Sequence, residues 1–155
     1  MKLKDIIIVS LIFLLDRISK IYVIHLDEIL LNSEIITSKF INIQLIWNEG
    51  VAFGLFAFDD KSFYNLITGF IIIIILTLIY FIRKTRGIEK YSFIAILGGA
   101  LGNVFDRFLY SAVPDFIDIH YQNFHWFTFN MADIFITVGI IMLLRKELFS
   151  KNEKN

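Results

Sequence analysis

Long apolar runs, separated by short polar stretches, dominate the pattern of the chain. The runs cover residues 5–24, 63–82, 91–110 and 130–144. A helix takes about 20 residues to cross the hydrocarbon core of a bilayer. Inside lipid, the backbone must also form its hydrogen bonds within the segment. The pattern therefore predicts an all-α membrane protein, a four-transmembrane-helix bundle that forms one domain over residues 1–155.

The pattern changes to alternation in the first outer loop, residues 25–62. In residues 40–47 (FINIQLIW), apolar side chains from Ile41 to Trp47 alternate with Asn and Gln. A period of two is typical of a half-buried strand. We therefore predict a small extracytoplasmic β-sheet or loop region on the outer membrane face. The second outer loop, residues 111–129, ends in an aromatic cluster of the kind found at membrane interfaces.

Lysine and arginine concentrate at one end of the predicted bundle. Cytoplasmic loops of membrane proteins carry an excess of these residues. They precede the first helix, separate the second from the third, and follow the fourth, at Lys2, Lys4, Arg83, Lys84, Arg86, Lys90, Arg145, Lys146, Lys151 and Lys154. The outer loops contribute only Lys39 and Lys61. This distribution predicts a multi-pass protein with both termini in the cytoplasm.

The composition agrees with a membrane protein and excludes several functions. The chain is 57% hydrophobic and 19% charged, with a mean hydropathy of +0.68. Its formal net charge is zero and it contains no cysteine. It therefore offers no basic surface for nucleic acid, no disulfide and no thiol nucleophile. Asp16 and Arg17 interrupt the first apolar run, and no small-residue cleavage site follows, so we expect a retained helix rather than a cleaved signal peptide.

Three of the predicted helices carry polar residues at one depth, near the outer face. These residues are Asp16 and Lys20 in the first helix, Asn103, Asp106 and Arg107 in the third, and Asn130 and Asp133 at the start of the fourth. Within each helix they are mostly three or four positions apart and share a face. Charged groups inside lipid are costly and usually functional. We therefore predict a single site near the outer face. The glycines of residues 98–102 are expected to allow close helix packing.

Two aspartates, Asp115 and Asp133, offer a chemistry for this site. Two carboxyl groups held within a few ångströms share a proton. The ionised group can then activate water, while the protonated group donates to a scissile carbonyl oxygen. Sequence order alone does not select this pair. However, Asp16 has a lysine four residues on and Asp106 adjoins an arginine, so both are expected to form structural ion pairs.

Five segments resemble a known family. They are residues 16–20 (DRISK), 48–54 (NEGVAFG), 98–107 (GGALGNVFDR), 113–117 (VPDFI) and 129–133 (FNMAD). In this order, and in register with four helices, they resemble the pattern of the bacterial lipoprotein signal peptidase, or signal peptidase II, family. The chain departs from the usual family pattern at Arg17, Ser19 and Pro114, and none of these is a reacting group.

The resemblance implies an aspartic endopeptidase of the bacterial cytoplasmic membrane, surrounded by membrane lipid, with its active site near the outer face. Its substrates would be diacylated prolipoproteins, cut on the amino side of the lipid-modified cysteine without metal or cofactor. Globomycin-type peptides would inhibit it. Asp115 and Asp133 map onto the catalytic pair. Asn48, Asn103, Arg107 and Asn130 map onto supporting positions, Asp16 and Lys20 map onto the first-helix motif, and Asp106 and Gly50 are expected to support the site.

Other interpretations remain open from the residues alone. His25, His120 and His125 suggest a metal site, since Asp118 lies near two of them, but interfacial histidines are common and the pattern favours no metal. Intramembrane carboxylates also occur in small proton-coupled transporters. The nearly pure hydrocarbon inner halves of the predicted helices argue against a path across the membrane. A structural subunit, with polar residues that only join helices, is the third alternative.

Overall fold

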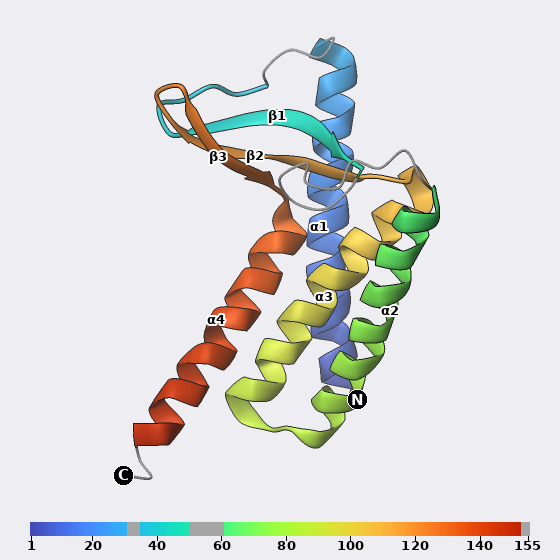
Figure 1. Cartoon of the computed structure of the whole chain (residues 1–155), viewed down its shortest axis with the longest axis vertical. Helices are drawn as coiled ribbons and strands as arrows, with labels where there is room; N and C mark the ends of the chain where they lie inside the picture. Colours follow the sequence, from blue (N-terminus) through green and yellow to red (C-terminus); the bar gives the residue numbers. More distant parts are fainter. Residues whose placement is uncertain (31–34, 50–60, 153–155) are drawn as a thin grey trace.

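The computed structural model describes residues 1–30, 35–49 and 61–152, and the elements follow each other as helices interrupted by short strands (Figure 1). They are α1 (Leu3–Leu30), β1 (Ile41–Asn48), α2 (Lys61–Lys84), α3 (Gly87–Tyr110), β2 (Val113–Tyr121), β3 (Phe124–Phe129) and α4 (Met131–Asn152). All four predicted helices are present. They extend beyond the apolar runs because helical structure continues into their polar flanks. Gly50 lies outside the described residues.

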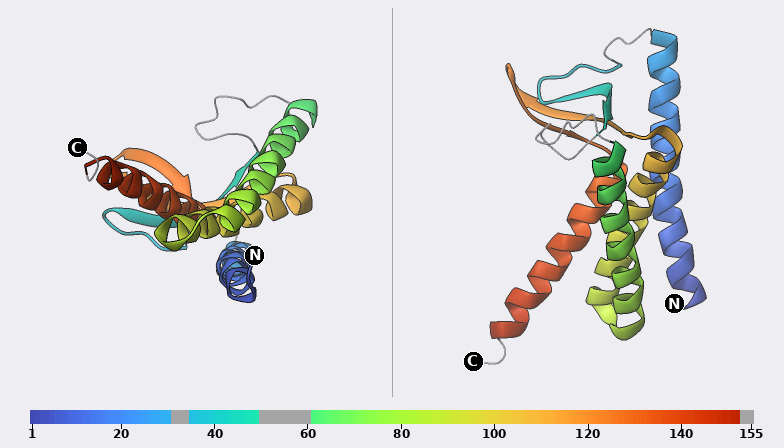
Figure 2. Two further views of the ribbon diagram at one scale, coloured as in Figure 1. Left: turned by 90° about the horizontal axis from the view of Figure 1, so that it is seen from below. Right: turned by 45° about the vertical axis from the view of Figure 1, so that its right-hand side comes forward.

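The helices form a bundle with the sheet at one end and both chain termini at the other (Figures 1 and 2). α3 is the central helix and packs against α1, α2 and α4. α1 runs past the end of the bundle and continues beside the sheet (Figure 2). β2 leaves the sheet-facing end of α3 and β3 leads directly into α4, so the sheet connects these two helices at one level.

The distribution of side chains is the reverse of that in a soluble bundle. In α1 the charged residues Asp16 and Lys20 are fully buried, whereas the apolar Leu14, Leu15 and Ile18 are 49%, 51% and 64% exposed. Exposed apolar faces of this extent indicate a lipid or protein environment. Intramembrane charges likewise face the interior of a bundle. The outward faces of the helices are therefore suited to lipid.

Two helices in the described ranges are long and apolar enough to cross a membrane. They are α2, through its segment Leu66–Lys84, and α3 over Gly87–Tyr110. α1 contains internal charges at Asp16, Arg17 and Lys20, all of which are buried in the protein. A hydropathy average over the sequence counts these charges as if they faced lipid, although in the folded protein they face the interior of the bundle.

Small residues let α3 approach its neighbours closely. A Cβ atom added to Gly102 would lie 2.3 Å from Oδ2 of Asp16 on α1, and one added to Gly99 would lie 2.4 Å from the backbone oxygen of Ala132 on α4. Real Cβ atoms do not come this close to their neighbours. The packing role expected for residues 98–102 is thus confirmed, and α3 uses two sides of its glycine-rich face for two different helices.

Gly102→Ala is expected to destabilise the protein by about 1–3 kcal/mol, since the new methyl group must displace a buried, hydrogen-bonded carboxylate. Gly69→Ala on α2 is the matched control, because nothing lies within 4 Å of the added Cβ. There the change should stabilise the helix by up to about 1 kcal/mol. Thermal unfolding in detergent measures both effects, and equal unfolding temperatures for the two variants would contradict the close approach.

The sheet is antiparallel, with strand order β1-β2-β3. β1 confirms the strand predicted at residues 40–47. No strand was predicted within the second outer loop, residues 111–129, where the structure has β2 and β3. Positions 113–116 of β2 are all buried, so side chains on both faces of the strand are covered and buried positions do not alternate with exposed ones. A strand covered on both sides gives no period-two signal.

Pro114 lies four residues beyond the end of α3. The helix ends at Tyr110, and Ser111 follows in the left-handed conformation with φ 56° and donates its N–H to the carbonyl oxygen of Arg107. Pro114 lies at the start of β2, opposite Trp47. Proline is tolerated at the first residues of a strand, where a missing N–H donor costs little.

The alternation in β1 has the opposite sense to the usual pattern. Asn42 is 8% exposed, whereas Ile41 and Trp47 are 45% and 41% exposed. An irregularity in the register between Ile43 and Ile46 also shifts the second half of the strand. The strand therefore turns polar groups inward and leaves apolar side chains at the surface, as the helices do.

Candidate active site

Asp115 lies near the start of β2, where the strand leaves α3. Its side chain is buried, with the residue 5% exposed. Oδ2 accepts a hydrogen bond of 3.0 Å from Nδ2 of Asn48 on β1, and Oδ1 accepts one of 2.6 Å from Nδ2 of Asn130. Two side-chain amides, from elements distant in sequence, thus hold this carboxyl group in one orientation.

Asp133 is held by the first turn of α4. Its Oδ2 accepts from the backbone N–H of Asn130 at 3.1 Å, and its own backbone N–H donates to Oδ1 of Asn130 at 3.2 Å. This reciprocal pair is a capping box, which satisfies donors that a helix start leaves without partners. Asn130 therefore both begins α4 and touches Asp115 and Asp133.

A third asparagine connects Asp133 to a buried lysine. Nδ2 of Asn103 on α3 donates to Oδ1 of Asp133 at 2.9 Å. Oδ1 of the same asparagine accepts from Nζ of Lys20 at 2.9 Å. The amide therefore has one defined orientation, because its oxygen faces an ammonium group and its nitrogen faces a carboxylate.

Lys20 is the centre of a buried charge cluster that adjoins Asp133 through Asn103. Besides Asn103, its Nζ donates to Oδ2 of Asp16 at 2.9 Å and to Oδ2 of Asp106 at 2.6 Å. All three ammonium protons are thus used. Arg17 adds a second cation, with Nη1 2.5 Å from Oδ1 of Asp106. Buried charges are tolerated when they are paired and hydrogen-bonded in this way.

The pKa of Asp115 is raised from 3.8 to about 6, mainly by burial, which disfavours the charged carboxylate. The negative charge of Asp133 raises the pKa further, whereas the hydrogen bonds from Asn48 and Asn130 lower it. The two carboxyl groups therefore interact electrostatically. A proton near neutral pH resides more readily on Asp115 than on an ordinary aspartate.

The raised pKa of Asp115 predicts a stability that depends on pH. Because the pKa of Asp115 is about 6 in the folded protein and 3.8 for an ordinary aspartate, protonation favours the folded state. This stabilisation is complete below about pH 3.8 and is lost as the pH rises to about 6. The loss should be about 3 kcal/mol. Denaturation of wild type and Asp115→Asn from pH 4 to pH 8 measures it. A stability difference between the two that does not change with pH would contradict the prediction.

The structure brings most of the predicted site residues together. Asn48, Asn103 and Asn130 contact the two aspartates, and Asp16, Lys20 and Asp106 form the adjoining charge cluster.

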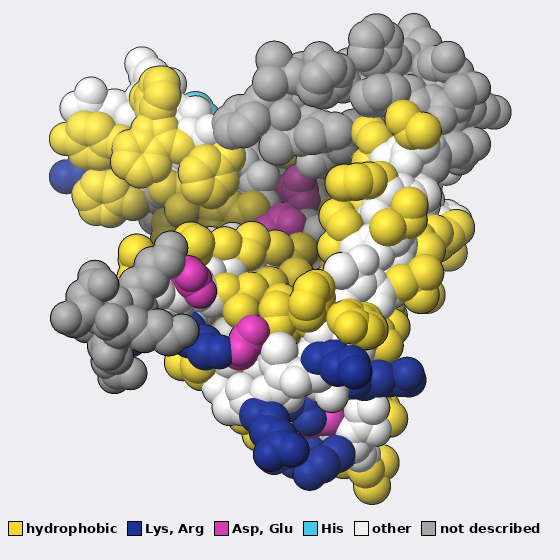
Figure 3. Space-filling model, turned by 60° about the horizontal axis from the view of Figure 1, so that its bottom comes forward, with side chains coloured by type: hydrophobic (Ala, Val, Ile, Leu, Met, Phe, Trp, Pro, Cys, Tyr) yellow, Lys and Arg dark blue, Asp and Glu magenta, His cyan; other side chains and the backbone are white. Residues whose placement is uncertain are grey.

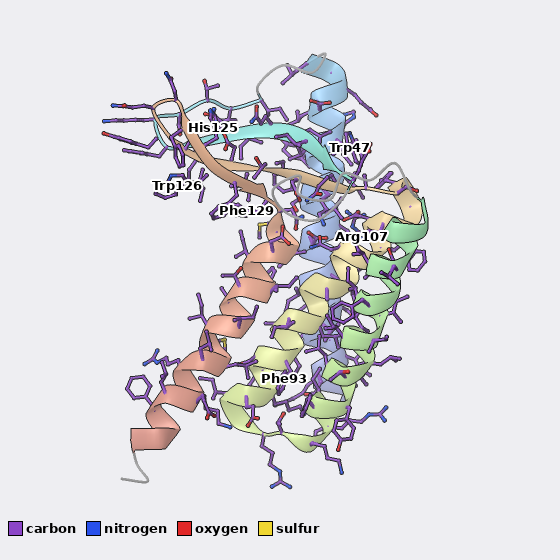
Figure 4. The ribbon with its side chains drawn as sticks, in the orientation of Figure 1. Trp47, Phe93, Arg107, His125, Trp126 and Phe129 are labelled. Carbon is purple, nitrogen blue, oxygen red and sulfur yellow. The ribbon has the colours of Figure 1, made fainter. Side chains whose placement is uncertain are left out.

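Asp106 does pair with cations, but they are Lys20 and Arg17. The prediction that Asp106 pairs with the adjacent Arg107 was wrong. Neighbouring residues of a helix point about 100° apart, so the two side chains face different directions. Nη1 of Arg107 instead lies 3.5 Å from the backbone oxygen of Asn103, and Figure 4 places this residue at the sheet end of α3.

Two contributions to the site were missed from the sequence. Oδ1 of Asp16 accepts the backbone N–H of Ala132 at 2.9 Å, which joins α1 to the first turn of α4. Arg17 was not assigned to the site from the sequence, yet it pairs with Asp106. The first is a backbone contact and leaves no signal in the sequence. The spacing of Asn130 and Asp133, in contrast, is a capping signature that could have been recognised.

Exposed apolar helix faces around a buried cluster of carboxylates, amides and cations are typical of membrane proteins with a functional polar site. The comparisons with known proteins give the family. The model of the signal peptidase (SPase) II family matches residues 8–149. The chain is similar to the lipoprotein signal peptidase of Pelagibacter ubique (strain HTCC1062), with 47% identity over 97% of this chain and 90% of that protein. It is also similar to the lipoprotein signal peptidase of Anaplasma phagocytophilum (strain HZ), with 36% identity over 97% and 95% of the two chains.

A solved bacterial membrane enzyme, determined by the in meso method at 2.3 Å resolution, has the same fold, with a TM-score of 0.78 and 28% identity. The match covers 98% of this chain and 92% of the other. The chain therefore belongs to the lipoprotein signal peptidase, or signal peptidase II, family. It is a membrane protease of lipoprotein processing, and the comparisons do not support the transporter alternative.

Proposed function

We propose that the protein is an aspartic endopeptidase that removes the signal peptide from diacylglyceryl-modified prolipoproteins, on the amino side of the lipid-modified cysteine. Asp115 and Asp133 are the catalytic pair. The observation that supports this proposal is the position of Asn130, whose side chain and backbone contact both carboxyl groups. Two acids from separate elements are thereby held at one place.

The surroundings of the two carboxyl groups give them different roles. The pKa of Asp115 is raised to about 6, so it is the member that holds the proton and donates it to the scissile carbonyl oxygen. Asp133 accepts hydrogen bonds from the side-chain amide of Asn103 and the backbone N–H of Asn130, which hold its carboxyl group in place, and we assign it the role of the base. Asp133 takes a proton from the attacking water and passes it to the leaving amine as the C–N bond breaks, while Asp115 recovers its proton as the carbonyl group re-forms.

Lys20 acts on this chemistry at a distance. Its ammonium group polarises the amide of Asn103, which donates to Asp133. Asp16 and Asp106 balance the positive charges of Lys20 and Arg17, so Lys20 orients Asn103 without adding a net charge to the site. Asn48, Gly50 and Arg107 are the residues that we assign to the substrate backbone. A globomycin-type peptide would occupy the same place.

The proposed topology has four spanning helices, with both termini in the cytoplasm and the sheet on the outer membrane face. Basic side chains gather at the end of the bundle opposite the sheet (Figure 3). Lys2, Lys4, Arg83, Arg86 and Lys90 line a cavity of about 630 Å³ there. An excess of lysine and arginine is typical of cytoplasmic loops. This orientation places the aspartates at the outer leaflet, where acyl chains would anchor the scissile region of a substrate.

The proposal is tested by incubating the purified protein with a diacylated prolipoprotein and with the same protein lacking the lipid. Mass spectrometry of the products identifies the cleaved bond. Cleavage only of the lipidated substrate, directly before the modified cysteine and unaffected by chelators, is the expected result. Cleavage at another bond, or equal cleavage of both substrates, would contradict the assignment.

A further inference from the structure

We propose that the β2–β3 hairpin binds a divalent transition-metal ion, of which zinc is the best match, through Asp118, His120 and His125. One potential ligand atom from each of these residues lies within 4.8 Å of the other two. The residues belong to two adjacent strands, and His120 and His125 are direct partners in the register. This site is separate from the proposed catalytic pair.

The distances suit ligands that converge on one ion. Nδ1 of His125 lies 2.6 Å from Oδ2 of Asp118, and Nδ1 of His120 lies 3.7 Å from the same oxygen. The two imidazole rings are nearly parallel, with centroids 5.2 Å apart. Ligand atoms about 2 Å from a tetrahedral zinc ion are roughly 3.3 Å apart. The three atoms thus need only small movements to coordinate one ion.

Two polar atoms of this cluster lack partners, which points to a ligand. Nδ1 of His120 and Oδ1 of Asp118 are buried and form no hydrogen bond within the part of the chain that the structure describes. The residues are only 9% and 1% exposed. A buried polar atom without a partner is costly. A bound cation would satisfy the histidine nitrogen and the carboxylate together.

The ligand types select the class of metal. Two imidazoles suit zinc, copper, nickel or iron, whereas calcium and magnesium prefer oxygen ligands. Three protein ligands leave a fourth position for water in a tetrahedral site. The side chain of His125 is 52% exposed, and Figure 4 shows it on the hairpin, away from the helix bundle. An ion and its water can therefore enter from the aqueous side.

The site lies on the opposite face of β2 from Asp115. The pairing of β2 with β1 shows that the irregularity lies in β1, so β2 runs regularly from Asp115 to Asp118. Side chains three positions apart in a regular strand point to opposite faces. The ion would therefore join the two strands of the hairpin without reaching the peptide bond that is cut.

Zinc binding to the purified, tag-free and EDTA-treated protein in detergent tests the proposal. Calorimetric titration with Zn²⁺ should give one site per chain, and Co²⁺ in its place should give the strong visible absorption of a tetrahedral site. His125→Ala and His120→Ala should each weaken binding at least about tenfold. Thermal unfolding of the wild type should shift upward with Zn²⁺, and this shift should be lost in both variants.

Two variants serve as controls. His25→Ala removes the third histidine of the chain, an exposed residue of α1, and should bind as the wild type does. Asp115→Asn should also bind normally, which separates this site from adventitious binding to the catalytic carboxylates. The proposal fails if no saturable binding occurs, if both hairpin variants still bind as the wild type does, or if Asp115→Asn abolishes binding. Since the readout is binding and not cleavage, failure of the proposed function would leave this result unaffected.

Discussion

We expect Asp133→Asn and Asp115→Asn each to reduce kcat/KM for cleavage of a diacylated prolipoprotein by at least about a thousandfold, while the protein remains folded. An asparagine at position 133 cannot take a proton from water. An asparagine at position 115 carries no acidic proton to donate to the carbonyl oxygen. Each change keeps the size of the side chain, so most of the surrounding packing is retained. Initial rates measured by separation of product from substrate give the loss.

The control is Asp27→Asn, which removes a carboxylate from α1 outside the proposed machinery and should keep the wild-type rate. Thermal unfolding of all four proteins shows whether the fold is kept. If either active-site variant retained more than about a tenth of the wild-type rate, acid–base catalysis by this pair would be excluded. The two aspartates would then serve only to join β2 and α4, as in a structural subunit.

Lys20→Met destabilises the protein by about 3–5 kcal/mol, the second large effect that we expect. Methionine matches the length of lysine but cannot neutralise the carboxylates of Asp16 and Asp106, which are 0% exposed. Two negative charges would then be buried, with Arg17 as their remaining close cation. The amide of Asn103 would also lose the donor that orients it. Chemical denaturation in detergent measures the change.

Lys39→Met is the matched control, since Lys39 is exposed and its replacement should change stability by less than about 0.5 kcal/mol. A triple variant, Lys20→Met with Asp16→Asn and Asp106→Asn, removes the unpaired charges and should recover part of the lost stability. If Lys20→Met were as stable as Lys39→Met, the buried cluster would not depend on the ammonium group. If the triple variant were less stable than Lys20→Met, uncompensated charge would not be the cause.

The amino-acid sequence alone was sufficient to predict the helices and to identify most of the polar residues in the site. Apolar runs of about 20 residues have few alternatives to helix in a bilayer, because lipid offers no hydrogen bonds to the backbone. Charges within such runs must find partners, so Asp16, Lys20 and Asp106 could be assigned to the bundle interior. The alternation in residues 40–47 likewise identified β1, although not which of its faces is buried.

The pairing of these residues depended on the fold. Asn130 contacts two aspartates because β2 and the first turn of α4 meet beside β3, and Gly102 admits Asp16 because α1 and α3 nearly touch. β2 escaped prediction, since a strand covered on both faces has no alternation to read. β3 is mostly exposed and largely aromatic, so it shows no clear alternation either. The convergence of Asp118, His120 and His125 depends on strand register as well. Spacing along the chain determines which residues share a helix face or a strand face. Contacts between elements depend on packing and register, which arise only when the whole chain has folded.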